Sequence, residues 1–439
     1  MPQSPPVFVP SLPEAHRSIA VPKNAVWWKR FFTFLGPGYL VSVGYMDPGN
    51  WATDLAAGAR YGYALLFVIL ASNLMAMVLQ HLSVRLGVVS GRDLAQACRD
   101  YYSKPAAVIL WLLCEVAIVA CDLAELLGSA LALNLLFGLP MAIGVCVTTL
   151  DVLVLLLLQN KGFRYTEAIV ITLVATIAVC FGLQVFLSKP DWAGVVVGLV
   201  PTAQVLVDPA MLYIAMGILG ATVMPHNLYL HSSIVQTRAW QASEREKREA
   251  IKYGTIDSSL ALSMAFFVNA AILIVSAAVF HRGGHYEVGD IREAYLLLSP
   301  LLGVAFASTL FALALLASGQ ASTLTATLAG QIVMEGFIHV RLPAWLRRLV
   351  TRLLALIPAL ITIIWFGESS TGWLLVLSQV VLSLQLSFAV IPLVIFTSDP
   401  KRMGPFVNPR WLSVTSWVVA VVIAALNGWL LLQTVLQGV

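Results

Sequence analysis

The sequence predicts an all-α integral membrane protein with eleven transmembrane helices, ten of them in two inverted repeats of five and one added at the end. Three observations predict this fold. Of the 439 residues, 59% are hydrophobic and only 11% are charged, less than half the charged share of an ordinary soluble domain. Apolar stretches of about 20 residues recur along the chain, each long enough to cross ~30 Å of hydrocarbon. The first and the sixth of these stretches carry matching interruptions centred on proline.

The predicted spans follow one another with short polar connections. They cover residues 33–58, 62–84, 106–136, 140–159, 166–187, 211–236, 253–280, 300–325, 344–366, 372–396 and 413–436. Residues 1–30 hold a Pro-rich, polar stretch with no apolar core, so we expect a flexible cytoplasmic tail and no cleaved signal. The expected units are 31–200 for the first repeat, 201–397 for the second and 398–439 for the last helix, all in one inseparable transmembrane domain.

The distribution of basic residues predicts the orientation. With a cytoplasmic N-terminus, 22 of the 26 Lys and Arg residues fall on the inner side and four on the outer side. The C-terminus is then external, and the basic excess needs no nucleic-acid partner. Short loops and the lack of a targeting signal favour the inner (plasma) membrane of a bacterial cell, with a lysosomal or other plasma membrane as the alternative. Lipids are the expected surroundings, and no obligate protein partner is evident. The five cysteines stand singly and lack the spacing of a metal site, so we interpret them as small buried hydrophobic residues.

The first interruption is "YMDPGNWATDL", residues 45–55. Pro48 lacks a backbone donor and Gly49 loosens the chain, so the first span is expected to unwind near its middle. Lipid cannot pair the freed carbonyls and amides, and such backbone persists only inside protein or beside a cavity. In transporters, unwound segments of this kind hold ions.

The sixth span repeats the interruption in "GATVMPHNLYLHSS", residues 220–233. The two breaks share the pattern x-Pro-x-Asn, as Asp47-Pro48-Gly49-Asn50 and Met224-Pro225-His226-Asn227. Five spans separate them, and an odd number inverts the second unit relative to the first. The pair of breaks therefore predicts an inverted repeat whose binding site lies at the membrane midplane.

Side chains at the breaks favour a divalent transition metal. Asp47 offers a charged oxygen and Asn50 a neutral one, while Met224 offers a soft thioether. The freed carbonyl of Ala221, one turn before Met224, is a further candidate. Oxygen ligands alone would suit magnesium or calcium, whereas a thioether favours softer metals. The alternative for Met224 is ordinary packing, as for most membrane methionines.

The third span carries three acids, Glu115, Asp122 and Glu125, which lie within about 80° of one another on a helix. With Asp47 they would cost roughly 12 kcal/mol to insert, at ~3 kcal/mol per acid, which indicates a function. Such a stripe beside a metal-binding aspartate indicates a proton route. The alternative is structural pairing with arginines at the start of the ninth span, and both can hold together. The candidate arginines are Arg347, Arg348 and Arg352.

Two histidines of the sixth span and two glutamines of the tenth span are further candidates. His226 lies at the second break and serves equally as a proton relay or as a hydrogen-bonded core histidine; His231 has a weaker claim. Gln379 and Gln385 are six residues apart and point to different faces, so spacing alone does not decide which one reaches the site.

At DPGN and MPH the chain resembles the natural resistance-associated macrophage protein (Nramp) family of proton-coupled divalent metal transporters, most of all its bacterial manganese transporters. The stretches "ASGQASTLTATLAGQIVMEGF", "LVLSQVVLSLQL" and "CDLAELLG" extend the resemblance over nearly the whole chain. The family implies a fold like that of the LeuT-type amino acid transporters.

By this resemblance, five residues are implied as metal ligands, the last in some conformations only: Asp47, Asn50, Met224, Ala221 through its carbonyl, and Gln379. The proton pathway would include Asp47, His226, Asp122 and Glu125, and His231 has a weaker claim to belong to it. Glu115 would lie nearer the external vestibule. The arginine partner is open between Arg348 and Arg352. Relatives that carry magnesium lack the site methionine, so Met224 argues against that branch.

Three functions compete at this stage. The first is symport of Mn²⁺, and also Fe²⁺, with protons into the cytoplasm, the metal being cargo and no cofactor being needed. The second is a sodium-coupled organic-solute symporter of the same architecture, in which Asp47 would stand where a substrate carboxylate should bind. The third is a membrane metalloenzyme or metal receptor, for which the chain has no HExxH or comparable signature.

Overall fold

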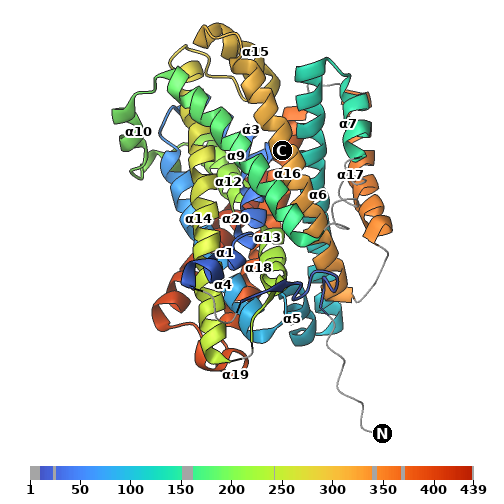
Figure 1. Cartoon of the computed structure of the whole chain (residues 1–439). Helices are drawn as coiled ribbons and strands as arrows, with labels where there is room; N and C mark the ends of the chain where they lie inside the picture. Colours follow the sequence, from blue (N-terminus) through green and yellow to red (C-terminus); the bar gives the residue numbers. More distant parts are fainter. Residues whose placement is uncertain are drawn as a thin grey trace.

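A computed structural model describes residues 10–22, 26–150, 162–241, 243–338, 344–366 and 371–437. The described chain is almost entirely helical, and its long helices form one bundle, in which some stand upright and others cross obliquely (Figure 1). Its one sheet is a two-residue parallel pair, β1 (Ile19–Ala20) with β2 (Arg238–Ala239). The chain is thus an all-α multi-pass membrane protein, as the hydropathy predicts.

The helices of the first half are α1 (Trp27–Phe34), α2 (Pro37–Val43), α3 (Pro48–Tyr61), α4 (Leu66–Ser90), α5 (Leu94–Tyr101), α6 (Lys104–Phe137), α7 (Met141–Thr149), α9 (Phe163–Ser188) and α10 (Trp192–Gly198). Those of the second half are α11 (Gln204–Val207), α12 (Pro209–Thr222), α13 (Pro225–Ile234), α14 (Glu244–Ser276), α15 (Ile291–Leu302), α16 (Ala307–Ile338), α17 (Ala344–Phe366), α18 (Thr371–Ser398), α19 (Pro400–Met403) and α20 (Arg410–Gln437). Short 3₁₀ turns cover Gly44–Met46, Val235–Thr237 and Gly404–Phe406, and a π turn covers Ala277–His281.

Eight helical segments of the described chain are long and apolar enough to cross a membrane. They correspond to the second, third, fifth to eighth, tenth and eleventh predicted spans. The first span is divided by its break. Of the fourth predicted span, 140–159, the structure shows α7, and residues 151–161 lie outside the described residues. The apolar part of the ninth, Arg352–Trp365, is shorter. The total of eleven therefore stays a prediction.

The eighth span differs from the expected 300–325. Gly303, with φ 67°, ends α15 in a left-handed cap, and the next helix runs from Ala307 to Ile338. The Ser/Thr-rich second half of α16 is helical because it lies inside the protein, packed against α6 and α9. A helix inside the protein needs small side chains that allow close approach, and it needs no apolar surface facing lipid. The hydropathy of the sequence therefore placed the end of the eighth span too early.

Both predicted breaks are present at the centre of the bundle. In the first, α2 passes through the turn Gly44–Met46 to Asp47, whose extended backbone starts α3. In the second, α12 ends at Thr222 and α13 begins after Met224. Helix α14 lies along α2, α3 and α4, while α18 packs on α12 and α6. The four half-helices are thereby enclosed by protein, as unwound backbone at membrane depth requires.

The expectation of a flexible tail is wrong for residues 10–22. Leu12 and Ala15 are buried, and Ser11 Oγ donates to Asp93 Oδ2 across 2.5 Å. Strand β1 adds two residues to β2, which follows the second broken helix. Tertiary contacts therefore order a segment whose own composition predicts no structure. Residues 1–9 lie outside the described residues.

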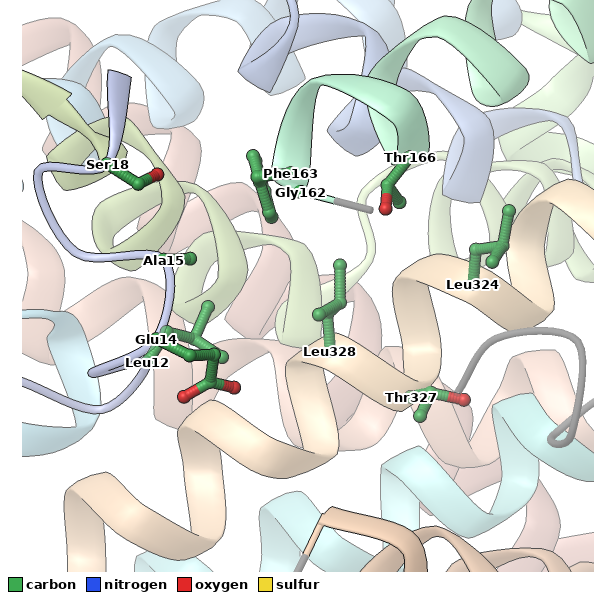
Figure 2. A pocket seen from close by; sticks show the side chains of 10 residues that line it. All are labelled: Leu12, Glu14, Ala15, Ser18, Gly162, Phe163, Thr166, Leu324, Thr327 and Leu328. Atoms are coloured by element: carbon green, nitrogen blue, oxygen red, sulfur yellow. The ribbon is translucent and has the colours of Figure 1, made fainter. Parts of the chain in front are cut away.

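Beneath this segment lies a hollow of about 700 Å³, its open mouth included, between the segment, the start of α9 and α16. Figure 2 shows Leu12 and Ala15 on one side and Phe163, Leu324 and Leu328 on the others. Its lining is mostly apolar and carries a single carboxylate, so it offers no set of metal ligands.

The junction between α1 and α2 is held by charged side chains from three other segments. Asp257 of α14 accepts from the amides of Gly36 and Gly38, at 3.1 and 2.6 Å. Arg238 of β2 donates to two carbonyls at the end of α1 and pairs with Glu167 of α9 at 2.6 Å. These groups satisfy backbone atoms that helix ends leave without partners, and they fix α2, the N-terminal half of the first span.

Candidate metal site at the two helix breaks

Asp47 lies at the N-terminus of α3, where its side chain caps the helix. Oδ1 accepts from the backbone amide of Asn50 at 2.9 Å and from Asn50 Nδ2 at 2.6 Å. Pro48 occupies the first helical position, where its missing N–H costs nothing. The carboxylate is completely buried, and the positive end of α3 favours its charge.

The side chain of Asn50 joins the two breaks. Nδ2 also donates to the carbonyl oxygen of Ala221 at 2.9 Å and to that of Gly44 at 3.4 Å. The Ala221 carbonyl lies in the last turn of α12, where helical acceptors lose their intrahelical partners. Three oxygens from both halves of the protein thus surround one electropositive NH₂ group, an arrangement that a cation can occupy once the amide turns.

Gln379 of α18 reaches the same carboxylate from the other side. Its Nε2 lies 3.5 Å from Asp47 Oδ2 and 3.1 Å from Ser378 Oγ. A Cβ atom on Gly49 would overlap the Gln379 amide, so a glycine at this position is what lets α18 approach the break. The structure therefore brings Gln379 to the site, where helical spacing left the choice between two glutamines open.

Met224 precedes α13 and is completely buried, three residues after Ala221. It packs in a small cluster between the third, eighth and tenth spans, with Ala117, Cys121, Ala326 and Leu382. Within the described residues no three His, Cys, Asp or Glu side chains gather as in a resident metal centre. The implied ligands are one carboxylate, amides, a carbonyl and a thioether, a set that suits exchange better than permanent retention.

Two acids of the third span face one arginine. Arg352 Nη1 lies 3.5 Å from Asp122 Oδ1 and 3.9 Å from Glu125 Oε2, and all three side chains are buried. The side chain of Arg348 lies outside the described part of the structure. Arg352 is thus the arginine that the structure places beside the acids, and its charge offsets part of their burial cost.

A thiol lies between these acids and the second break. Cys121 Sγ donates to Glu125 Oε1 across 3.5 Å and lies 3.8 Å from His226 Nε2. Sequence reasoning missed Cys121 because a lone cysteine in an apolar run is typical of packing. Its spacing four residues before Glu125, on the same helical face, was the only available signal.

His231 and Glu115 lie apart from this group. His231 Nδ1 is 2.9 Å from Gln80 Oε1, and Gln80 Nε2 donates to the Tyr45 hydroxyl at 2.8 Å, so His231 joins α13 to α4 and the first span. Glu115 is half-buried and accepts from Trp111 Nε1 at 2.8 Å. It lies between Asp122 and the α5 end of α6, which under the predicted orientation is the cytoplasmic side. The predicted orientation and the external position implied by the resemblance therefore exclude one another for Glu115.

Two pairs of half-helices that meet at a buried carboxylate, inside a bundle of membrane-spanning helices, define the broken-helix class of membrane transporters. The model of the natural resistance-associated macrophage protein-like (Nramp) family matches residues 38–433. The chain belongs to the Nramp family.

Curated relatives match over nearly their whole length. The divalent metal cation transporter MntH of Nostoc sp. is 67% identical over 431 residues, which are 98% of each chain. The MntH of Mesorhizobium japonicum is 60% identical over 427 residues, covering 97% of this chain and 94% of the relative.

Solved structures share the fold. The Eremococcus coleocola manganese transporter superposes with a TM-score of 0.89 at 42% identity, covering 95% of this chain and 90% of the other. Mhp1, a nucleobase-cation-symport-1 family transporter, superposes with a TM-score of 0.56 at 14% identity, over 90% and 92% of the chains. The second likeness concerns the fold alone, which is the LeuT-like inverted repeat.

Proposed function

We propose that this protein imports divalent transition metal ions, Mn²⁺ foremost and Fe²⁺ as well, together with protons, by alternating access across a bacterial inner membrane. The observation that carries the proposal is the contact of Asn50 Nδ2 with both Asp47 Oδ1 and the Ala221 carbonyl. One turn of this amide would exchange its NH₂ group for a metal ion held by oxygens from both breaks. The names of the MntH relatives and of the manganese transporter support the same cargo.

The donor set favours a transition metal over a hard cation. Asp47 supplies the only charged ligand, Asn50, Gln379 and the Ala221 carbonyl supply neutral oxygens, and Met224 supplies sulfur. Ca²⁺ takes six to eight oxygens and gains nothing from sulfur, whereas Mn²⁺ and Fe²⁺ accept fewer and softer ligands. Because the neutral ligands outnumber the charged one, the ion keeps a positive charge that can be released again.

Proton coupling follows from competition at Asp47. A bound metal requires the ionised carboxylate, so a proton on Asp47 must leave when metal arrives. His226 is linked through the Cys121 thiol to Glu125, which shares Arg352 with Asp122. We assign the proton to this route. An inside-negative potential favours the inward movement of both charges.

Alternating access is assigned to the half-helices. Asp47, Asn50 and Met224 have at most 1% of their surface exposed, so the site is closed to water on both sides. Movement of α2 with α13 would open the inner side, and movement of α3 with α12 the outer side. The ligands lie at the two helix breaks, about which the half-helices would move. They can therefore stay in place while the site opens to one side and then to the other.

The test is uptake of radiolabelled Mn²⁺ into proteoliposomes with an inside-negative potential. We expect unlabelled Fe²⁺ to compete, and excess Ca²⁺ or a mixture of amino acids to leave uptake unchanged. Competition by an amino acid, with sodium required, would replace this proposal by the organic-solute symporter. The absence of Mn²⁺ uptake would remove the metal function altogether.

A further inference from the structure

The carbonyl groups of the first break are already paired with donors. Met46 O accepts from Trp51 Nε1 at 3.1 Å and from Ser318 Oγ at 2.5 Å. Tyr45 O accepts from Asn269 Nδ2 at 2.8 Å. These donors come from α3, α16 and α14. Met46 O therefore has donors for both of its lone pairs, and Tyr45 O has a donor for one.

This pairing is unexpected for a helix break. An unwound turn frees carbonyl groups, and such carbonyls are the hard oxygen ligands with which transporters coordinate cations. Here Trp51 is completely buried, and its ring meets Phe181 and Phe311 edge-on at centroid distances of 4.7 and 5.2 Å. The indole is thus held in place, and its N–H, which can only donate, stays on the Met46 carbonyl.

We propose that Trp51, Ser318 and Asn269 are specificity-determining positioning residues that withhold the carbonyls of Tyr45 and Met46 from the metal. The first break then contributes the side chains of Asp47 and Asn50 and the Gly44 carbonyl, which accepts from Asn50 Nδ2 at 3.4 Å, but not the carbonyls of the two residues that follow Gly44. This inference rests on the proposed metal function and adds the means by which the site disfavours Ca²⁺.

Coordination number gives the physical reason. Five groups gather oxygens at the site, and one oxygen from each is fewer than the six to eight that Ca²⁺ prefers: Asp47, Asn50, Gln379 and the carbonyls of Gly44 and Ala221. Release of the Met46 carbonyl would add a hard oxygen one residue from Asp47. Such an oxygen favours Ca²⁺ strongly and Mn²⁺ weakly, because Met224 already satisfies part of the softer ion's preference.

The test uses the double variant Trp51→Phe/Ser318→Ala, which removes both donors to Met46 O and keeps an aromatic ring at residue 51. The single variant Ser318→Ala serves if the double variant folds poorly. Thr325→Ala is the matched control, because Thr325 is a buried hydroxyl on the same helix whose Oγ1 bonds the Ser322 carbonyl at 2.8 Å. The readout is the Ca²⁺ concentration that halves Mn²⁺ uptake in proteoliposomes, divided by the KM for Mn²⁺.

We expect this ratio to fall about tenfold in the double variant, the effect of roughly one buried hydrogen bond, and to stay unchanged in Thr325→Ala. A general structural defect would slow uptake without changing the ratio. An unchanged ratio in variants that still transport Mn²⁺ would overturn this inference and leave the proposed function intact. Failure of the wild type to transport Mn²⁺ would overturn both.

Discussion

The Asn50 side chain donates to Asp47 Oδ1 across 2.6 Å, and the same NH₂ group donates to the Ala221 carbonyl from the other half of the protein. The electropositive end of an amide thus occupies the point where the two inverted repeats meet. Metal binding by Asn50 Oδ1 requires the amide to turn, which also breaks its 3.4 Å contact with Asn269 Nδ2. We therefore expect the Asn50 amide to take a second position when metal binds.

Replacement of Asp47 tests the only charged ligand. Asp47→Asn keeps the shape of the side chain but removes its charge, so we expect Mn²⁺ affinity to fall by about a hundredfold or more. Isothermal titration in detergent measures it. Glu287→Gln, which removes an exposed acid in the loop after α14, should bind normally. Normal Mn²⁺ binding by Asp47→Asn would be incompatible with the assigned site.

Replacement of Met224 tests the soft ligand. In Met224→Ala we expect Mn²⁺ uptake to continue at a reduced rate, while Ca²⁺ and Mg²⁺ become effective competitors because only oxygen ligands remain. Met211→Ala is the control, since Met211 is an equally buried methionine on α12 that belongs to a separate apolar cluster. Unaltered metal selectivity in Met224→Ala would show that this methionine only packs.

Replacement of Glu125 tests the proton route. Glu125→Gln removes the acceptor beside Cys121 and Arg352, so we expect Mn²⁺ influx with at least about a tenfold smaller accompanying proton influx. Fluorescent pH and metal indicators inside the same liposomes give the ratio. Glu293→Gln, at an exposed position of α15, should retain the wild-type ratio. Full coupling in Glu125→Gln would place the proton path elsewhere.

The buried ion pair at the α1–α2 junction predicts a stability effect. Glu167→Gln leaves the Arg238 guanidinium buried with a neutral partner, and we expect a loss of about 3 kcal/mol in the free energy of unfolding. Arg164→Gln removes a guanidinium that is 44% exposed from the same carboxylate and should cost under about 1 kcal/mol. Thermal unfolding in detergent compares the two. Equal Tm values for both variants would refute this ranking.

The contact of the N-terminal segment predicts a pH effect. Burial raises the pKa of Asp93 to about 6, although hydrogen bonds from Ser11 and the Gln96 amide oppose the rise. The folded protein therefore holds a proton that the unfolded chain has lost, and stability falls as pH rises from about 4 to about 6, by about 1.4 kcal/mol per pKa unit. Asp93→Asn should flatten this part of a Tm-against-pH curve. A slope equal to that of the wild type would contradict it.

Local chemistry explains which features the sequence could predict. Pro48 and Pro225 interrupt apolar runs, and Asp47 is too costly to bury without a role, so breaks and ligands leave signals within a few residues. Trp51 leaves none, and Cys121 leaves only its spacing from Glu125, because thiols and indoles in apolar runs are typical of packing. Their roles depend on partners more than 100 residues away or on the path of the unwound backbone.

Long-range packing explains the remaining differences. Arg348 and Arg352 are one helical turn apart, and only the packing of α17 on α6 shows that Arg352 reaches the acids. The order of residues 10–22 depends on Asp93 and β2, which composition cannot reveal. The extension of α16 to Ile338 depends on burial against α6.

The most direct test of the account is simultaneous measurement of Mn²⁺ influx and internal pH in proteoliposomes held at an inside-negative potential, with Ca²⁺ in excess outside. The account predicts that Mn²⁺ enters despite the Ca²⁺ and that the interior acidifies in proportion to the Mn²⁺ transported. Influx of Mn²⁺ without acidification, or inhibition by Ca²⁺ at equal concentration, would contradict it.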